Sequence, residues 1–171
     1  MGVTALQKNL GTTRKEAQEF YDEYFKRLPK LAEYLDETIL QAKKLGYTQT
    51  LFGRRRHFPA LRSPLPYIKA MAERAASNAP IQGMPADMIK LAMIQITEKL
   101  RDAGLADKVH MTMQIHDELV FEVADEVLLQ AEKIIKETME NVLETVPFDI
   151  QNKVPIEVSV SSGKNWGETK E

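Results

Sequence analysis

The stretch MTMQIHDELVFEV, residues 111–123, carries the strongest indication of fold class in this chain. Two apolar, β-prone runs meet there at His116, Asp117 and Glu118. Because side chains alternate between the two faces of a strand, we expect every second residue of each run to share a face. In the first run these residues are Met111, Met113 and Ile115, and in the second they are Leu119, Phe121 and Val123. The pattern predicts a β-hairpin with the polar triplet at or near its tip.

This hairpin has two interpretations that the stretch alone leaves open. A carboxylate on a stiff hairpin can be aimed at a metal ion, because strands position side chains better than loops do. However, Asp and Glu are common turn residues, so the hairpin by itself slightly favours a purely structural role. Other motifs must decide between the two.

Composition limits the class of protein. A length of 171 residues with 43% hydrophobic content allows one domain with a substantial core, or a domain plus a smaller lobe. The absence of cysteine excludes disulfides and thiolate metal sites. There is no N-terminal apolar run and no segment long enough to span a bilayer, so we expect a soluble, cytoplasmic protein without a membrane partner. A net charge of −2 predicts that any DNA contact is local or shared with another chain.

Periodicity and the glycine and proline positions predict the remaining elements. Thr13 and Glu16 form a capping-box pattern that opens a helix, and Pro29 separates this helix from a second one ending at Gly46. The later elements are an Arg-rich hairpin over 47–58, a helix over 67–78, a break at Pro80, a long helix over 86–103, a helix capped by Asp125 and a final strand over 155–160.

The long helix over 86–103 has an apolar stripe that we expect to be buried. Its members are Ile89, Ala92, Met93, Ile96 and Leu100. Asp87 would lie in the first turn, where the helix dipole favours an acid. Together the elements predict an α+β fold, with a helical and hairpin-bearing part over 1–66 and a compact part over 67–171.

Two groups of polar side chains are candidates for contact with nucleic acid. Arg74 and Asn78 are four residues apart on one helical face, and Gln82 follows just beyond the expected break. These groups can donate hydrogen bonds to phosphate, sugar or base edges, although an ion pair of Arg74 with Glu73 or a neighbouring acid on a solvated face is the plainer alternative. Arg54 and Arg56 share one face of a strand and could clamp a phosphate backbone, although surface arginines are ordinarily just solvated.

Four motifs in this order give the decisive signal. They are TLFGRRRHFP over 50–59, ERAASNAPIQG over 73–83, AD-x-IK-x-AM over 86–93 and QIHDELVFEV over 114–123. This series closely resembles the C-terminal part of family A DNA polymerases, the bacterial DNA polymerase I type. The similarity runs from Gly2 to Trp166 and includes a Gly-x-x-Trp-Gly ending. It implies a C-terminal palm portion over 67–171 joined to part of the fingers over 1–66.

The resemblance also implies roles for individual residues. Asp117 corresponds to one of two palm aspartates that hold catalytic Mg²⁺, and Glu118 supports the metal site beside it. His116 corresponds to the residue that meets the primer end. The residues that correspond to template and primer contacts near the nascent base pair are Arg74, Asn78 and Gln82. The implied substrates are primer–template DNA and deoxynucleoside triphosphates, in replication or repair.

Family A catalysis also uses elements that lie upstream of this similarity. One is a strand with the partner aspartate, and the other is a helix that binds the incoming triphosphate. The chain opens with MGVTALQKNLG, where the family has Tyr-Gly followed by a similar run. Two-metal phosphoryl transfer needs ions ~3.5–4 Å apart bridged by several carboxylates. We therefore expect the isolated chain to be inactive and to polymerise only with a second polypeptide. An inert truncated fragment and a non-catalytic DNA- or partner-binding module are the alternatives.

Overall fold

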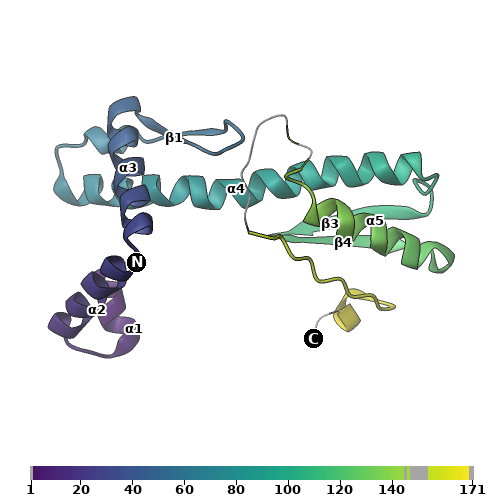
Figure 1. The fold of residues 1–171 in the computed structure, drawn as a ribbon, viewed down its shortest axis with the longest axis horizontal. Helices are drawn as coiled ribbons and strands as arrows, with labels where there is room; N and C mark the ends of the chain where they lie inside the picture. Colours follow the sequence, from purple (N-terminus) through teal and green to yellow (C-terminus); the bar gives the residue numbers. More distant parts are fainter. Residues whose placement is uncertain (1, 145, 147–153, 170–171) are drawn as a thin grey trace. The chain divides into compact units, whose positions relative to one another are not determined.

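The computed structural model describes residues 2–144, 146 and 154–169. The chain divides into two compact units, Met1–Gln82 and Gly83–Glu171. Helices dominate, and the described residues form two antiparallel sheets of two strands each (Figure 1). The predicted α+β class is confirmed.

The first unit is mainly helical. Its elements are α1 (Val3–Leu10), α2 (Arg14–Arg27), α3 (Pro29–Leu45), β1 (Tyr47–Gln49), β2 (Arg55–His57), the 3₁₀ turn η1 (Pro59–Arg62) and the first part of α4 (Pro66–Asp102). Helix α3 contacts β1 and η1. A core cluster forms from α3, the residue after β2, η1 and α4, and its residues are Ala42, Phe58, Leu61, Ala72, Ala76 and Ala79. The small alanine side chains allow the segments to approach closely.

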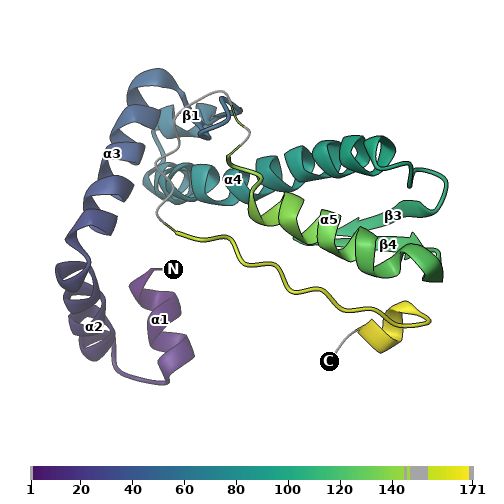
Figure 2. The same cartoon turned by 45° about the vertical axis from the view of Figure 1, so that its right-hand side comes forward.

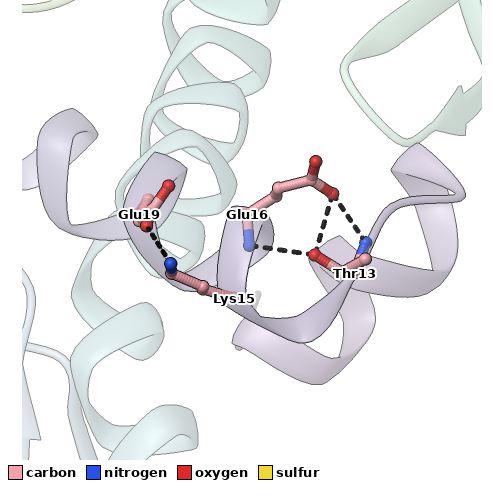
Figure 3. A network of polar contacts seen from close by, with 4 residues as sticks. All are labelled: Thr13, Lys15, Glu16 and Glu19. Atoms are coloured by element: carbon pink, nitrogen blue, oxygen red, sulfur yellow. Dashed lines mark hydrogen bonds and ion pairs between the residues drawn. The ribbon is translucent and has the colours of Figure 1, made fainter.

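The predicted capping box at the start of α2 is confirmed (Figure 3). The backbone N–H of Glu16 donates to Thr13 Oγ1 over 3.3 Å, and the Thr13 N–H donates to Glu16 Oε2 over 2.9 Å. The hydroxyl groups of Thr12 and Thr13 also donate to that carboxylate oxygen. These donors favour the ionised form and lower the pKa of Glu16 from 4.5 to about 2, with the Thr12 hydroxyl contributing most.

The expected break in the helix at Pro80 is wrong. A single helix, Pro66–Asp102, continues through both Pro80 and Pro85. Pro80 removes one amide donor and its ring crowds the carbonyl of Ala76, but buried Ala76 and Ala79 anchor the surrounding turns in the core of the first unit. Because no helix begins near residue 86, Asp87 is an interior helix residue with 6% exposure and not a first-turn acid.

The second unit contains the hairpin predicted from residues 111–123. Its elements are the rest of α4, β3 (Val109–Ile115), β4 (Glu118–Val123), η2 (Asp125–Val127), α5 (Leu128–Glu140) and η3 (Trp166–Thr169). The hairpin lies beside α5 and the C-terminal end of α4 in both views (Figures 1 and 2). Buried residues come from all three, and they include Ala92, Ile96, Leu100, Val109, Ala131 and Ile135. Of the predicted helix stripe, Ile89 and Met93 are only half-buried.

The expected alternation along β3 is wrong because the strand contains an irregularity. Met111 pairs with Phe121, whereas Met113 pairs with Val120, so Thr112 is the extra residue of a β-bulge. The bulge shifts the alternation of side chains between the two faces of β3 by one residue. Met113 and Ile115 therefore share a face with Val120, and Met111 lies on the opposite face with Phe121.

Two further expectations fail in the second unit. Asp125 begins the 3₁₀ turn η2 and does not cap α5, whose N-cap is Val127. Residues 155–160 are not in a strand, since a strand requires a paired neighbour and none of the described residues pairs with them. The Val158 N–H instead donates to Glu140 Oε1 over 3.2 Å. Across the described residues, no helix has the length and apolar content that a bilayer crossing needs.

Candidate functional site

The polar triplet lies at the tip of the β3–β4 hairpin, as predicted. Ile115 ends β3 and pairs with Glu118, the first residue of β4, so His116 and Asp117 form a two-residue turn. His116 has a φ of 55°, and no other described residue except glycine has a positive φ. The Gln114 side-chain amide donates to the His116 carbonyl oxygen over 2.6 Å. The turn is therefore short, and the hydrogen bond from the Gln114 side chain stabilises it.

The three side chains at this tip are exposed. Asp117 and Glu118 offer carboxylate oxygens, which are the ligands that Mg²⁺ prefers. Within the part of the chain that the structure describes, no three His, Asp or Glu side chains gather closely enough to share a metal ion. The donor type thus fits magnesium, but two adjacent carboxylates cannot bridge a pair of ions by themselves.

Arg74, Asn78 and Gln82 form an exposed row along α4. Their spacing of four residues places them on one side of the helix. Because α4 is continuous, Gln82 extends this row directly, whereas a break at Pro80 would have separated it. Glu73 pairs with Lys43 over 2.8 Å. The row belongs to the first unit, and the hairpin tip belongs to the second.

The Arg-rich segment forms the β1–β2 hairpin. Thr48 pairs with Arg56, and Gln49 pairs with Arg55, so these two arginines lie on opposite faces. The Arg56 guanidinium is 5.2 Å from the centre of the Phe58 ring. Arg54 immediately precedes β2 and is exposed. The predicted pairing of Arg54 and Arg56 on a phosphate backbone stays a prediction.

Comparison with known proteins identifies the family. The sequence profile of DNA polymerase family A matches residues 1–168. The chain belongs to DNA polymerase family A. DNA polymerase I from Rhizobium leguminosarum is 42% identical over 169 residues, which cover 98% of this chain and 16% of that protein. The thermostable DNA polymerase I of Thermus filiformis is 39% identical over 171 residues, covering 100% of this chain and 19% of the relative.

A solved structure has a closely similar fold. It is the POL domain of Pol1 from M. smegmatis in complex with DNA primer-template and dNTP. The TM-score is 0.87 at 40% sequence identity, and the match covers 98% of this chain and 28% of that chain. The resemblance inferred from the motifs is therefore confirmed. The chain spans less than a fifth of the length of these two curated relatives.

Proposed function

We propose that this chain supplies the C-terminal portion of a DNA-directed DNA polymerase and takes part in template-directed nucleotidyl transfer to a primer 3′ end. The observation that carries the proposal is the two-residue turn that exposes Asp117 beside Glu118 in a family A chain. The proposed substrates are primer–template DNA and deoxynucleoside triphosphates, in replication or repair. Residues 1–66 would form part of the fingers, and residues 67–171 the C-terminal palm.

The hairpin tip would provide half of a magnesium site. Asp117 would be the metal ligand, and Glu118 would add negative charge and a second set of acceptor oxygens next to it. Magnesium, when bound, stabilises charge on the attacking and leaving oxygens of phosphoryl transfer. The short turn and the Gln114 contact restrict the backbone that carries Asp117, which keeps its carboxylate in a narrow range of positions.

The remaining site residues would bind the DNA. His116, next to the proposed metal ligand, would contact the primer end. The row of Arg74, Asn78 and Gln82 would contact template and primer near the nascent pair. Every base pair carries acceptors at equivalent minor-groove positions, so donors placed there test pair geometry without reading sequence.

A second polypeptide would supply the other carboxylates and the triphosphate-binding helix. The support for this proposal is the pair of neighbouring carboxylates at the tip, which are too few to hold two magnesium ions. The isolated 171-residue chain would then be inactive.

Primer extension tests this function. The purified chain is assayed alone and mixed with the polymerase segment of the Rhizobium relative that precedes the matched residues. We expect extension only in the mixture. Asp117→Asn should abolish it, whereas Asp107→Asn, which removes an exposed acid elsewhere in the second unit, should not.

The other outcomes separate the alternatives. Extension by the chain alone would contradict the need for a partner. An inactive mixture with measurable binding of the chain to duplex DNA would favour a non-catalytic binding module. Inactivity together with absence of binding would favour an inert fragment of a polymerase.

A further inference from the structure

We propose that one face of the β1–β2 hairpin binds a phosphate group of a nucleic-acid backbone, with Arg55 as the contact and with Tyr47 and Gln49 as positioning residues. The inference deepens the proposed function and rests on it for the identity of the ligand as nucleic acid. It assigns the contact to the arginine between Arg54 and Arg56, on the face of β2 opposite to Arg56.

The strand register creates this face. Tyr47 pairs with His57, and Gln49 pairs with Arg55, so these side chains project to the same side of the hairpin. Gln49, Arg55 and His57 are exposed, and Tyr47 is half-buried. Thr48, on the opposite side, is buried with 7% exposure. The hairpin therefore packs its Thr48 side inward and presents the Arg55 side to solvent.

Two contacts hold Arg55 in a defined position on this face. Its Nε donates to Gln49 Oε1 over 2.9 Å. Its guanidinium carbon is 4.7 Å from the centre of the Tyr47 ring, a cation–π distance. The Tyr47 ring also lies beside His57, with 5.4 Å between ring centres. The bond to Gln49 uses only the Nε–H donor, so the N–H groups of the two terminal guanidinium nitrogens are not needed for it.

This arrangement suits a phosphate better than a freely rotating arginine would. A guanidinium fork binds two phosphate oxygens at once through parallel N–H bonds. An arginine that is already ordered loses less side-chain entropy when it binds. Gln49 and Tyr47 thus prepare Arg55 for a bidentate contact, and the neighbouring His57 adds a further donor on the same face.

The charge distribution supports a partner that carries phosphate groups. Residues 38–72 contain seven Lys or Arg and no Asp or Glu, within a chain whose net charge is −2. The cations are Lys43, Lys44, Arg54, Arg55, Arg56, Arg62 and Lys69. Lys43 is paired with Glu73, and the remaining cations, centred on three consecutive arginines, are the local basic feature expected of a phosphate-backbone contact. The net charge of −2 for the whole chain does not reveal this local excess of positive charge.

Fluorescence anisotropy with a labelled primer–template duplex tests the inference, using the full chain over a series of salt concentrations. We expect binding at low salt that weakens as salt rises. Arg55→Gln should lower the affinity by about tenfold, the effect of a lost hydrogen-bonded charge. It should also reduce the slope of log K against log[salt] by about 0.9, the value for one phosphate contact.

Companion variants separate phosphate contact from a structural role. Arg55→Lys should restore the salt slope but not the full affinity, because an ammonium keeps the charge and loses the planar fork. Gln49→Ala should weaken binding in the wild-type background and have no effect in the Arg55→Gln background. Arg14→Gln removes an equal charge from an exposed position on α2 and should change neither quantity.

An unchanged salt slope in Arg55→Gln would overturn the proposal, as would absence of duplex binding by the wild-type chain at low salt. Equal losses from Arg14→Gln and Arg55→Gln would also overturn it, because they would indicate only general charge attraction. The readout is independent of polymerisation. If the mixture of chains proves inactive while Arg55 still sets the salt slope, the proposed enzymatic function fails and the phosphate contact stands.

Discussion

The side-chain amide of Gln114 donates a 2.6 Å hydrogen bond to the backbone carbonyl of His116. Gln114 lies on the last part of β3, and His116 is the first residue of the turn that carries Asp117. This hydrogen bond links the backbone of the turn to a side chain of the preceding strand. Its removal should free the backbone on which the proposed metal ligand depends.

We predict that Gln114→Ala lowers the free energy of unfolding by about 0.5–1.5 kcal/mol, the net value of one hydrogen bond. Amide exchange at His116 and Asp117 should accelerate more than exchange at Val109 or Val123, at the far end of the hairpin. Denaturant titration and hydrogen exchange measure the two effects. Equal exchange rates in the wild type and the variant would show that the bond does not order the turn.

Backbone conformation at His116 gives a second prediction. Its φ of 55° strains a residue with a Cβ atom, and glycine adopts this conformation without that cost. We expect His116→Gly to be more stable than His116→Ala by about 1 kcal/mol, measured by denaturant unfolding. Both variants lack the imidazole, so the comparison isolates the backbone. The opposite order of stability would rule out a positive φ at this position.

Gln82 is expected to sense the geometry of the primer terminus. In an active mixture, Gln82→Ala should reduce discrimination against a mismatched terminus by up to tens-fold, because an unsatisfied buried donor costs about 1–3 kcal/mol. Extension rates on matched and mismatched primers provide the measurement. Gln130→Ala, an exposed glutamine on α5, is the control. Identical extension profiles for Gln82→Ala and the wild type would remove Gln82 from this role.

The capping box predicts a specific pH dependence. The hydroxyl and amide donors around Glu16 lower its pKa from 4.5 to about 2 in the folded chain. The stabilisation is therefore present above pH 4.5 and is lost as the pH falls from about 4.5 to about 2. The difference in urea midpoint between the wild type and Glu16→Gln should shrink across this range.

Glu19→Gln is the matched control for that measurement. Glu19 lies on the same helix and forms a 3.8 Å ion pair with Lys15 (Figure 3), and both side chains are well exposed. Such exposed pairs contribute little to stability. A difference for Glu16→Gln that stays constant down to pH 2 would contradict the lowered pKa.

Packing of α4 in the second unit gives a fifth prediction. Ile96 is 0% exposed and Ile94 is 57% exposed on the same helix. Ile96→Ala should destabilise the chain by about 2–5 kcal/mol through lost contacts and a cavity. Ile94→Ala should change stability by no more than about 0.5 kcal/mol. Similar effects from the two substitutions would mean that this face of α4 is not the packed one.

Local chemistry explains why several features could be predicted from the sequence. The capping box depends on residues three positions apart, and the hairpin tip depends on two adjacent apolar runs, so short-range pattern is sufficient for both. The four ordered motifs were enough to place the chain among family A polymerases, because their length and order make coincidence a poor explanation. The same motifs named Asp117 and Glu118 as candidate site residues.

Three features depend on contacts between different segments of the chain, and local sequence patterns did not predict them. Burial of Ala76 and Ala79 outweighs the local tendency of Pro80 to end a helix, and it places Gln82 on the same helix as Arg74. The bulge at Thr112 reassigns the faces of β3 through pairing with β4. The pairing of β1 with β2 brings Gln49 to Arg55, six residues away. In each case the deciding free energy comes from partners that periodicity within one segment does not include.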